Sequence, residues 1–201
     1  MLQEQTVRLR ALEHTDLPQV VAWFNDPAVR LQVARSSPLS LTAEERAYEA
    51  LLKSTTEVQF LIEVLDGADR PPRAAGVCGL HRIDWRNRGC ALGIVIGEDV
   101  DRGMGHGTAA VRALVRHAFR DLGLHRVELE VYPDNVRARR CYEKVGFVVE
   151  GVRRQAMFKD GAFRDNVLMG VLAPAWLAAD LASEVPPPST APAGRGTRRR
   201  R

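Results

Sequence analysis

Residues 93–115 read GIVIGEDVDRGMGHGTAAVRALV and join a strand-like run to a helix-like run through a glycine-rich loop. Its glycines, Gly103, Gly105 and Gly107, stand at alternate positions just after Arg102. Glycine in such a setting indicates a turn or a close approach of the backbone to a ligand. A helix N-terminus also exposes N–H groups without helical partners, and its dipole favours an anion. The stretch therefore predicts a phosphate-binding unit of strand, loop and helix.

Two common phosphate-binding motifs do not fit this loop. A Walker A loop ends in Gly-Lys-Ser/Thr, whereas Thr108 follows Gly107 directly. A dinucleotide fingerprint needs the spacing G-x-G-x-x-G, which glycines at alternate positions do not give. The pattern that remains is Arg-x-x-Gly-x-Gly, from Arg102 to Gly107.

A second segment, residues 135–147, reads NVRARRCYEKVGF. The two segments together resemble the signatures of the GNAT superfamily of N-acetyltransferases, Arg/Gln-x-x-Gly-x-Gly/Ala and Asn-x-x-Ala-x-x-x-Tyr-x-x-x-Gly-Phe. In the second signature the matching positions are Asn135, Ala138, Tyr142, Gly146 and Phe147. The runs NDPAVR, LGLHRVELEV and EGVRRQAMFKDGAFRDNVLMGVL are similar to the branch that holds ribosomal-protein alanine N-acetyltransferases and spermidine-type relatives.

The other elements complete a mixed α/β layout. Period-2 runs predict strands at 6–12, 58–65, 74–83, 90–97, 126–132, 147–156 and 163–172. Helical patterns occur at 17–24, 42–53, 105–122 and 136–145, with Thr42 and Glu45 as a capping box for the second. This order predicts an α/β (α+β) fold with helices flanking one twisted, mixed, mostly antiparallel sheet of about seven strands. The resemblance implies that 90–97 and 126–132 splay apart to hold acyl-CoA.

Composition and charge narrow the class of protein. The 201 residues, 45% of them hydrophobic, predict one domain at 1–184 and a disordered basic Pro/Arg-rich tail at 185–201. No long apolar run or signal peptide is visible, so we expect a soluble, cytoplasmic protein that does not bind membranes. Removing the tail's five arginines from the net charge of +4 leaves the domain near −1, which argues against specific nucleic-acid binding. Its three scattered cysteines favour reduced thiols.

The resemblance assigns the donor, acetyl-CoA. Main-chain groups of 94–96 would hold the pantetheine arm, and backbone amides of 103–108 would hold the pyrophosphate, with Arg102 adding charge. Asn135 is either a helix cap or a contact to the cofactor. The cofactor-binding residues implied are Ile94, Val95, Ile96, Arg102, Gly103, Met104, Gly105, His106, Gly107, Thr108 and Asn135.

The reaction that the resemblance implies is direct attack of an uncharged amine on the acetyl thioester, which needs a base, oxyanion donors and an acid for the leaving thiolate. The resemblance makes Tyr142 the acid. Relatives often carry a glutamate as base where this chain has Ala91, so the base must lie elsewhere. The candidates are His81, Asp84, Glu98, Glu130 and Glu128, of which Glu128 is the prediction.

Other chemistry is disfavoured. Cys141 beside Tyr142 is an alternative nucleophile, but no triad spacing accompanies it, and the superfamily transfers the acetyl group directly. No pair of histidines is accompanied by further residues at the spacing of metal ligands, so we expect no metal.

Acceptor recognition is expected in residues 25–42 and 154–166. Neither segment is strongly acidic, which favours a protein N-terminal α-amine over a polycation. The alternatives are a small-molecule amine (antibiotic, polyamine or metabolite) and, because of Ala91, an acyl-CoA-binding module without activity. Ribosome association through the arginine tail and a homodimer are left open.

Overall fold

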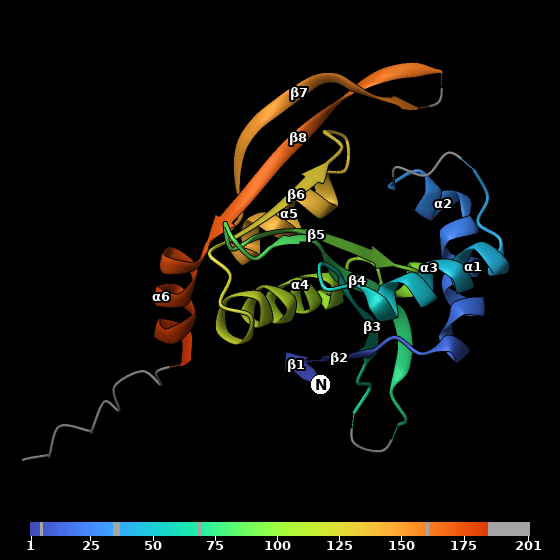
Figure 1. The fold of residues 1–201 in the computed structure, drawn as a ribbon, viewed down its shortest axis with the longest axis horizontal. Coiled ribbons are helices and arrows are strands. Elements are labelled where there is room, and N and C mark those ends of the chain that lie inside the picture. Colours follow the sequence, from blue (N-terminus) through green and yellow to red (C-terminus); the bar gives the residue numbers. More distant parts are fainter. Residues whose placement is uncertain (5, 34–36, 68–69, 160, 185–201) are drawn as a thin grey trace, which may run out of the picture.

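The computed structural model describes residues 1–4, 6–33, 37–67, 70–159 and 161–184. The strands in these ranges form one eight-stranded sheet (Figure 1). The strand order is β1-β2-β3-β4-β5-β6-β8-β7. Only β5 and β6 pair in parallel, and every other neighbouring pair is antiparallel. The predicted mixed, mostly antiparallel sheet flanked by helices is confirmed.

The strands are β1 Leu2–Glu4, β2 Val7–Ala11, β3 Val58–Val64, β4 Arg73–Asp84, β5 Gly89–Ile96, β6 Arg126–Val131, β7 Val148–Lys159 and β8 Ala162–Leu172. The helices are α1 Leu17–Asn25, α2 Pro27–Arg30, α3 Leu41–Lys53, α4 His106–Arg116, α5 Val136–Val145 and α6 Ala173–Glu184. Short 3-10 turns lie at His14–Asp16 and Asp99–Asp101, and a π-helical turn at His117–Asp121 continues α4.

Four local features differ from the sequence expectations. The strand β1 and the helices α2 and α6 were not predicted, because β1 and α2 have only three and four residues and α6 has only a weakly amphipathic pattern. The capping box at Thr42 and Glu45 is wrong, since α3 begins earlier. Its cap is Ser40, whose Oγ accepts a hydrogen bond from the Ala43 N–H at 3.2 Å.

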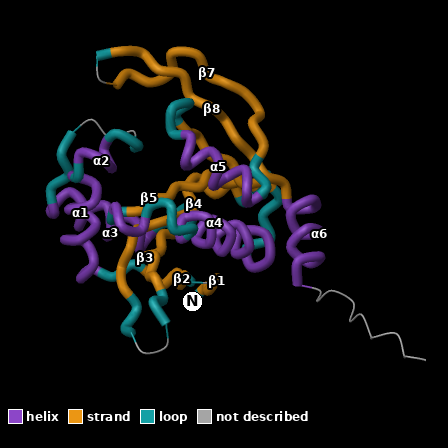
Figure 2. The backbone as a smooth tube through the Cα atoms, turned by 180° about the vertical axis from the view of Figure 1, so that it is seen from behind, coloured by secondary structure: helices purple, strands orange, loops and turns teal. Residues whose placement is uncertain are grey.

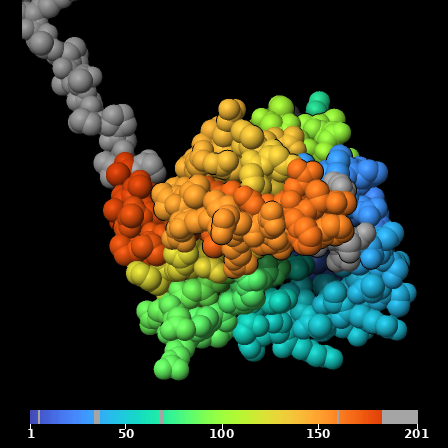
Figure 3. Space-filling view, turned by 90° about the horizontal axis from the view of Figure 1, so that it is seen from above, coloured from blue at the N-terminus to red at the C-terminus, as the bar shows by residue number. Residues whose placement is uncertain are grey.

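Helices cover both faces of the sheet (Figure 2). On one face, α4 and α5 pack on the main core, which includes Ile62, Leu80 and Leu92. On the other face, α1 packs on Leu61 and Val77 in a second cluster. These two sets come from alternate positions of the same strands, as the pleat requires. In the view from above, β7 and β8 form a band across the molecule, with α6 at one end of that band (Figure 3).

The sheet opens between β5 and β6. Their pairing is limited to Gly89 with Arg126, Cys90 with Val127, and Ala91 with Glu128. Beyond Ala91, β5 remains paired with β4 as far as Ile96, and no strand of the described part of the chain lies beside its other edge. The predicted splaying of these two strands is confirmed, and it leaves main-chain groups of β5 available at the opening.

Within the described ranges, no helix combines the length and apolar character needed to cross a membrane. The predicted disordered tail at 185–201 lies outside the described residues. The hairpin turn between β7 and β8 is described except for residue 160.

Candidate active site

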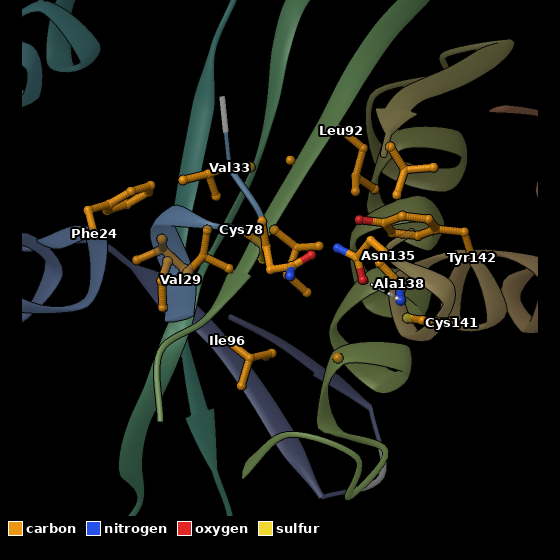
Figure 4. A pocket seen from close by; sticks show the side chains of 18 of the residues that line it. Phe24, Val29, Val33, Cys78, Leu92, Ile96, Asn135, Ala138, Cys141 and Tyr142 are labelled. Atoms are coloured by element: carbon orange, nitrogen blue, oxygen red, sulfur yellow. Dashed lines mark hydrogen bonds between the residues drawn. The ribbon is translucent and has the colours of Figure 1, made fainter. Parts of the chain in front are cut away.

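A cavity of about 910 Å³ follows the opening between β5 and β6. On one side it is lined by the glycine loop and α5, and on the other by α1, α2 and α3. Figure 4 shows Tyr142 and Cys141 on the α5 side, with Phe24 and Val29 opposite them. The cavity therefore connects the predicted donor site to the region between the sheet and the first three helices.

The glycine loop presents backbone to the cavity. Gly103 and Gly105 have φ values of +86° and +92°, a conformation that side-chain-bearing residues adopt at a cost. Gly105 is the N-cap of α4 and provides no side-chain cap, so the first N–H groups of the helix have no capping partner from it. A Cβ at either glycine would meet nothing within 4 Å. Met104 is exposed, and the His106 ring lies 3.3 Å from the Thr6 hydroxyl, which leaves the loop's backbone as its binding surface.

The Arg102 side chain makes contacts other than the expected one with a phosphate. Its guanidinium donates to the Gly97 carbonyl at 2.8 Å and the Ile96 carbonyl at 3.2 Å, and it pairs with Asp99. The side chain thus ties the loop to the end of β5 rather than projecting toward a phosphate. Asp101, with its side chain 2% exposed, anchors the same loop by accepting two 2.7 Å hydrogen bonds from Arg73.

Only alternate residues of β5 can offer main-chain groups to the opening. The Gly97 N–H donates to the Ala75 carbonyl at 2.8 Å, toward β4. Because successive residues of a strand point to opposite neighbours, Val95 also faces β4, whereas Ile94 and Ile96 face the opening. The Ile96 carbonyl already accepts from Arg102. All three residues of the expected trio line the cavity, and Ile94 has the main chain that is best placed to face the opening.

Helix α5 places the second signature at the cavity. The Asn135 Oδ1 accepts from the Ala138 N–H at 3.1 Å, so Asn135 is a helix cap that also lines the cavity. The Tyr142 ring points from α5 into the cavity (Figure 4) and packs 5.9 Å from the Phe147 ring, between centroids. Burial raises the pKa of Tyr142, which keeps its phenol protonated, as a proton donor requires.

Cys141 is present at the cavity as a neutral thiol. Burial raises the pKa of Cys141, and the Thr108 hydroxyl donates to its Sγ at 3.5 Å. A thiol with a raised pKa is a weak nucleophile. The arrangement favours direct transfer over a covalent acetyl-cysteine.

The two acids on β6 have different surroundings. Glu128 does not belong to the cavity lining: it lies 3.3 Å from Arg126 and 3.9 Å from Arg82, and its side chain is 48% exposed. Glu130 does line the cavity, where it accepts from the Asn166 amide at 2.5 Å and pairs with Arg153 at 3.0 Å. The structure thus gives the predicted base, Glu128, no contact with the cavity.

Of the remaining candidates, only His81 reaches the cavity. Asp84 accepts backbone N–H groups in the turn that follows it, and Glu98 accepts from the Trp23 indole at 2.8 Å. His81 is half-buried and lines the cavity together with Glu57. Burial lowers the pKa of His81, and the nearby Glu57 carboxylate partly opposes this.

Several lining residues were missed by the sequence reasoning. Arg137, Arg140 and Lys144 lie on the α5 side of the cavity, and Glu44 and Glu57 lie on the side of α3 and β3. The three cations are spaced three and four residues apart, so the sequence could have predicted that they share one face of α5. The sequence could not have predicted the position of Glu57, because that position depends on how α3 packs over the sheet. The cavity therefore has cations on its α5 side and the carboxylates of Glu44 and Glu57 on the side of α3 and β3, while Glu130 lines it from β6.

Across the described residues, no three His, Cys, Asp or Glu side chains gather as a metal site would need.

Comparison with known proteins places this geometry in a family. A family model described as "Acetyltransferase (GNAT) domain" matches residues 6–148. "Probable N-acetyltransferase YjcK" of Bacillus subtilis is 29% identical over 184 residues, covering 87% of this chain and 98% of that protein. "Putative ribosomal N-acetyltransferase YdaF" of the same organism is 34% identical over 101 residues, covering 50% of this chain and 55% of that protein.

Solved structures agree. Spermidine N-acetyltransferase from Vibrio cholerae, in complex with CoA and spermine, superposes with a TM-score of 0.79 at 25% identity. The match covers 86% of this chain and 99% of that one. The overall fold is therefore shared with an enzyme whose structure holds CoA.

Proposed function

Because this chain belongs to the GNAT acetyltransferase family and is an acetyl-CoA-dependent N-acetyltransferase, we propose that its acceptor is a small cationic amine. The observation that carries the proposal is the division of charge in the cavity. Arg137, Arg140 and Lys144 line the α5 side of the cavity, and Glu44 and Glu57 line the side of α3 and β3. Cations suit the phosphates of CoA, and carboxylates suit an ammonium group.

The residues present fit the donor. Backbone N–H groups of the loop at 103–108 would hold the pyrophosphate at the N-terminus of α4. The basic face of α5 would meet the remaining phosphate, and the amide nitrogen of Asn135 remains available because the cap uses only its oxygen. The pantetheine arm would lie in the opening beside Ile94, as an added strand would.

Tyr142 would act as the acid. The acetyl thioester is attacked by the amine, and the departing thiolate needs a proton near the middle of the cavity. The Tyr142 phenol points there and is held protonated by burial. General acid catalysis of this kind contributes about 10²- to 10⁴-fold to a rate.

The acceptor end combines charge with apolar surface. Tyr48 and Leu51 on α3 and Phe24 on α1 form walls, and Glu57 directly precedes β3. Because Glu130 is paired with Arg153, Glu57 is the main source of counter-charge for the acceptor. A slender amine with a second positive charge fits this end better than a neutral one. Among the relatives, the Vibrio cholerae protein named spermidine N(1)-acetyltransferase is 26% identical over 164 residues.

A protein N-terminal α-amine is the second candidate. The β7–β8 hairpin exposes Phe158 and Phe163, at 67% and 65%, and apolar surface of this kind suits a polypeptide. The ribosomal-protein alanine branch, ribosome association and a homodimer stay predictions. The module without activity is set aside, since the matching relatives are named as N-acetyltransferases.

Thiol release from acetyl-CoA with a panel of acceptors tests the proposal. The panel holds a polyamine, an aminoglycoside, a monoamine of similar length, and a peptide with N-terminal alanine. We expect the highest kcat/KM for the polycationic small amines, and an increase of about tenfold in their KM in Glu57→Gln, equal to about 1.4 kcal/mol.

The matched control is Glu49→Gln, an exposed residue of α3 outside the cavity lining, which should leave KM unchanged. A preference for the peptide, with KM insensitive to Glu57→Gln, would overturn the small-amine acceptor in favour of the second candidate.

A further inference from the structure

We propose that His81 is the base that removes the proton from the acceptor's ammonium group. The inference rests on the proposed function, and it supplies the group that neither Ala91 nor Glu128 provides. Glu128 lies outside the cavity lining, and alanine has no group that accepts a proton. His81 is in that lining, on the face of the sheet that α3 covers.

The strand register places His81 beside the position where relatives carry their base. His81 and Ala91 are direct partners across the antiparallel pair β4–β5. Direct partners point to the same face with Cβ atoms about 4.5–5.5 Å apart. Ala91 is also the last β5 residue that pairs with β6. A side chain from His81 can therefore serve the point where the sheet opens.

Two glycines leave room for the imidazole ring of His81. A Cβ added at Gly79 or at Gly93 would lie 3.3 Å from the His81 Nε2. Side chains there would crowd the ring, so their absence keeps the niche open. Gly93 stands next to Ile94, whose main chain borders the predicted pantetheine path. The ring nitrogen is thus held over the part of β5 that the thioester would pass.

Ionisable groups near His81 and in the same cavity come from β4, α3, β6 and the segment before β3. Two of these charges act on His81 directly: Glu57, which precedes β3, and Arg82, which follows His81 on β4. Glu44 and Tyr48 on α3 and Glu130 on β6 line the same cavity. Burial has the largest effect on the pKa of His81 and lowers it from the usual value of 6.5. A neutral imidazole at physiological pH is able to accept a proton.

The proton balance closes without another reactant. The ammonium group gives one proton to the His81 Nε2 and becomes an amine. Its nitrogen then bonds to the thioester carbon, and the carbon–sulfur bond breaks. The nitrogen loses a second proton as the amide forms, and Tyr142 gives one proton to the thiolate. These two protons cancel in the overall equation. His81 releases its proton to solvent, so each turnover yields an amide, a thiol and one proton.

The test is the pH dependence of kcat/KM in wild type, His81→Gln and Glu57→Gln. Wild type should lose activity as pH falls through the pKa of His81, because only the neutral ring accepts a proton. We expect His81→Gln to be about 10²- to 10³-fold slower at pH 7 and to recover at high pH, where the amine is already neutral. Glu57→Gln removes a carboxylate that raises this pKa, so its acid limb should move to lower pH.

His125→Gln is the control, since His125 is exposed and outside the cavity lining. The outcomes separate cleanly. No thiol release by wild type with any amine would refute the proposed function itself. Wild-type turnover with an unchanged acid limb in His81→Gln, or with an unmoved limb in Glu57→Gln, would overturn the role of His81 and leave the proposed function standing.

Discussion

Replacing Gly105 by alanine should weaken CoA binding far more than it weakens the fold. The Gly105 φ of +92° costs an L-residue about 1–2 kcal/mol, and the new methyl meets no protein atom within 4 Å. We expect a fall in Tm of about 2–8 °C in this 201-residue chain. The methyl would occupy the space in front of the α4 N-terminus, where the account places the pyrophosphate.

The matched control is Gly123→Ala. Gly123 has a φ of +63°, and a Cβ there also meets nothing within 4 Å, but it lies after the π-helical turn and outside the cavity lining. The two variants should therefore lose similar stability. Only Gly105→Ala should lose a charge-assisted hydrogen bond to phosphate, about 1.5–3 kcal/mol or about 10- to 150-fold in Kd.

Thermal unfolding with and without CoA measures the difference. At a CoA concentration 100 times the wild-type Kd, wild type gains about 2.7 kcal/mol, and a variant that binds 100-fold more weakly gains about 0.4 kcal/mol. Gly123→Ala should keep the full gain. A Kd for Gly105→Ala within about twofold of wild type would refute the assignment of the loop as the pyrophosphate site.

Three further variants probe the acid, the loop anchor and the C-terminal helix. Tyr142→Phe should lower kcat by about 10²- to 10⁴-fold while its CoA Kd, from calorimetry, stays within about threefold; equal loss of both would contradict an acid role. Asp101→Asn weakens the pair with Arg73 that holds the loop, so steady-state kinetics should show a raised KM for acetyl-CoA, and an unchanged KM would deny that anchor. Asp180→Ala removes the carboxylate that Arg116 contacts at 2.7 Å, and chemical denaturation should show a loss of about 1–3 kcal/mol with CoA affinity kept. A loss below about 0.5 kcal/mol would show that α6 does not depend on this contact.

The parts of the site that sequence could predict depend on short-range spacing. The glycines at 103, 105 and 107 and the pattern from Asn135 to Phe147 each occupy one loop or one helix, so their geometry follows from local rules. The opening between β5 and β6 could be predicted only from the family resemblance. The π-helical turn after α4 could not be predicted, because its residues continue the apolar period of the helix.

What could not be predicted depends on long-range packing. Glu57 and His81 meet at the cavity because β3 and β4 pair and α3 covers them, and neither residue has a motif around it. Arg102 matches its motif position, yet its guanidinium binds the carbonyls of Ile96 and Gly97, which a spacing rule does not encode. The acceptor segments were expected at 25–42 and 154–166, whereas the acids that line the cavity, Glu44, Glu57 and Glu130, all lie outside both segments.

The central claim is that acetyl-CoA and a small cationic amine react in one cavity. Its most direct measurement is mass spectrometry of the products from labelled acetyl-CoA and an equimolar mixture of polyamine and alanine-ended peptide. We expect one labelled acetyl group on the polyamine for each CoA thiol released, with little label on the peptide and none on the enzyme. Label retained on the enzyme at Cys141, or carried chiefly by the peptide, would contradict it.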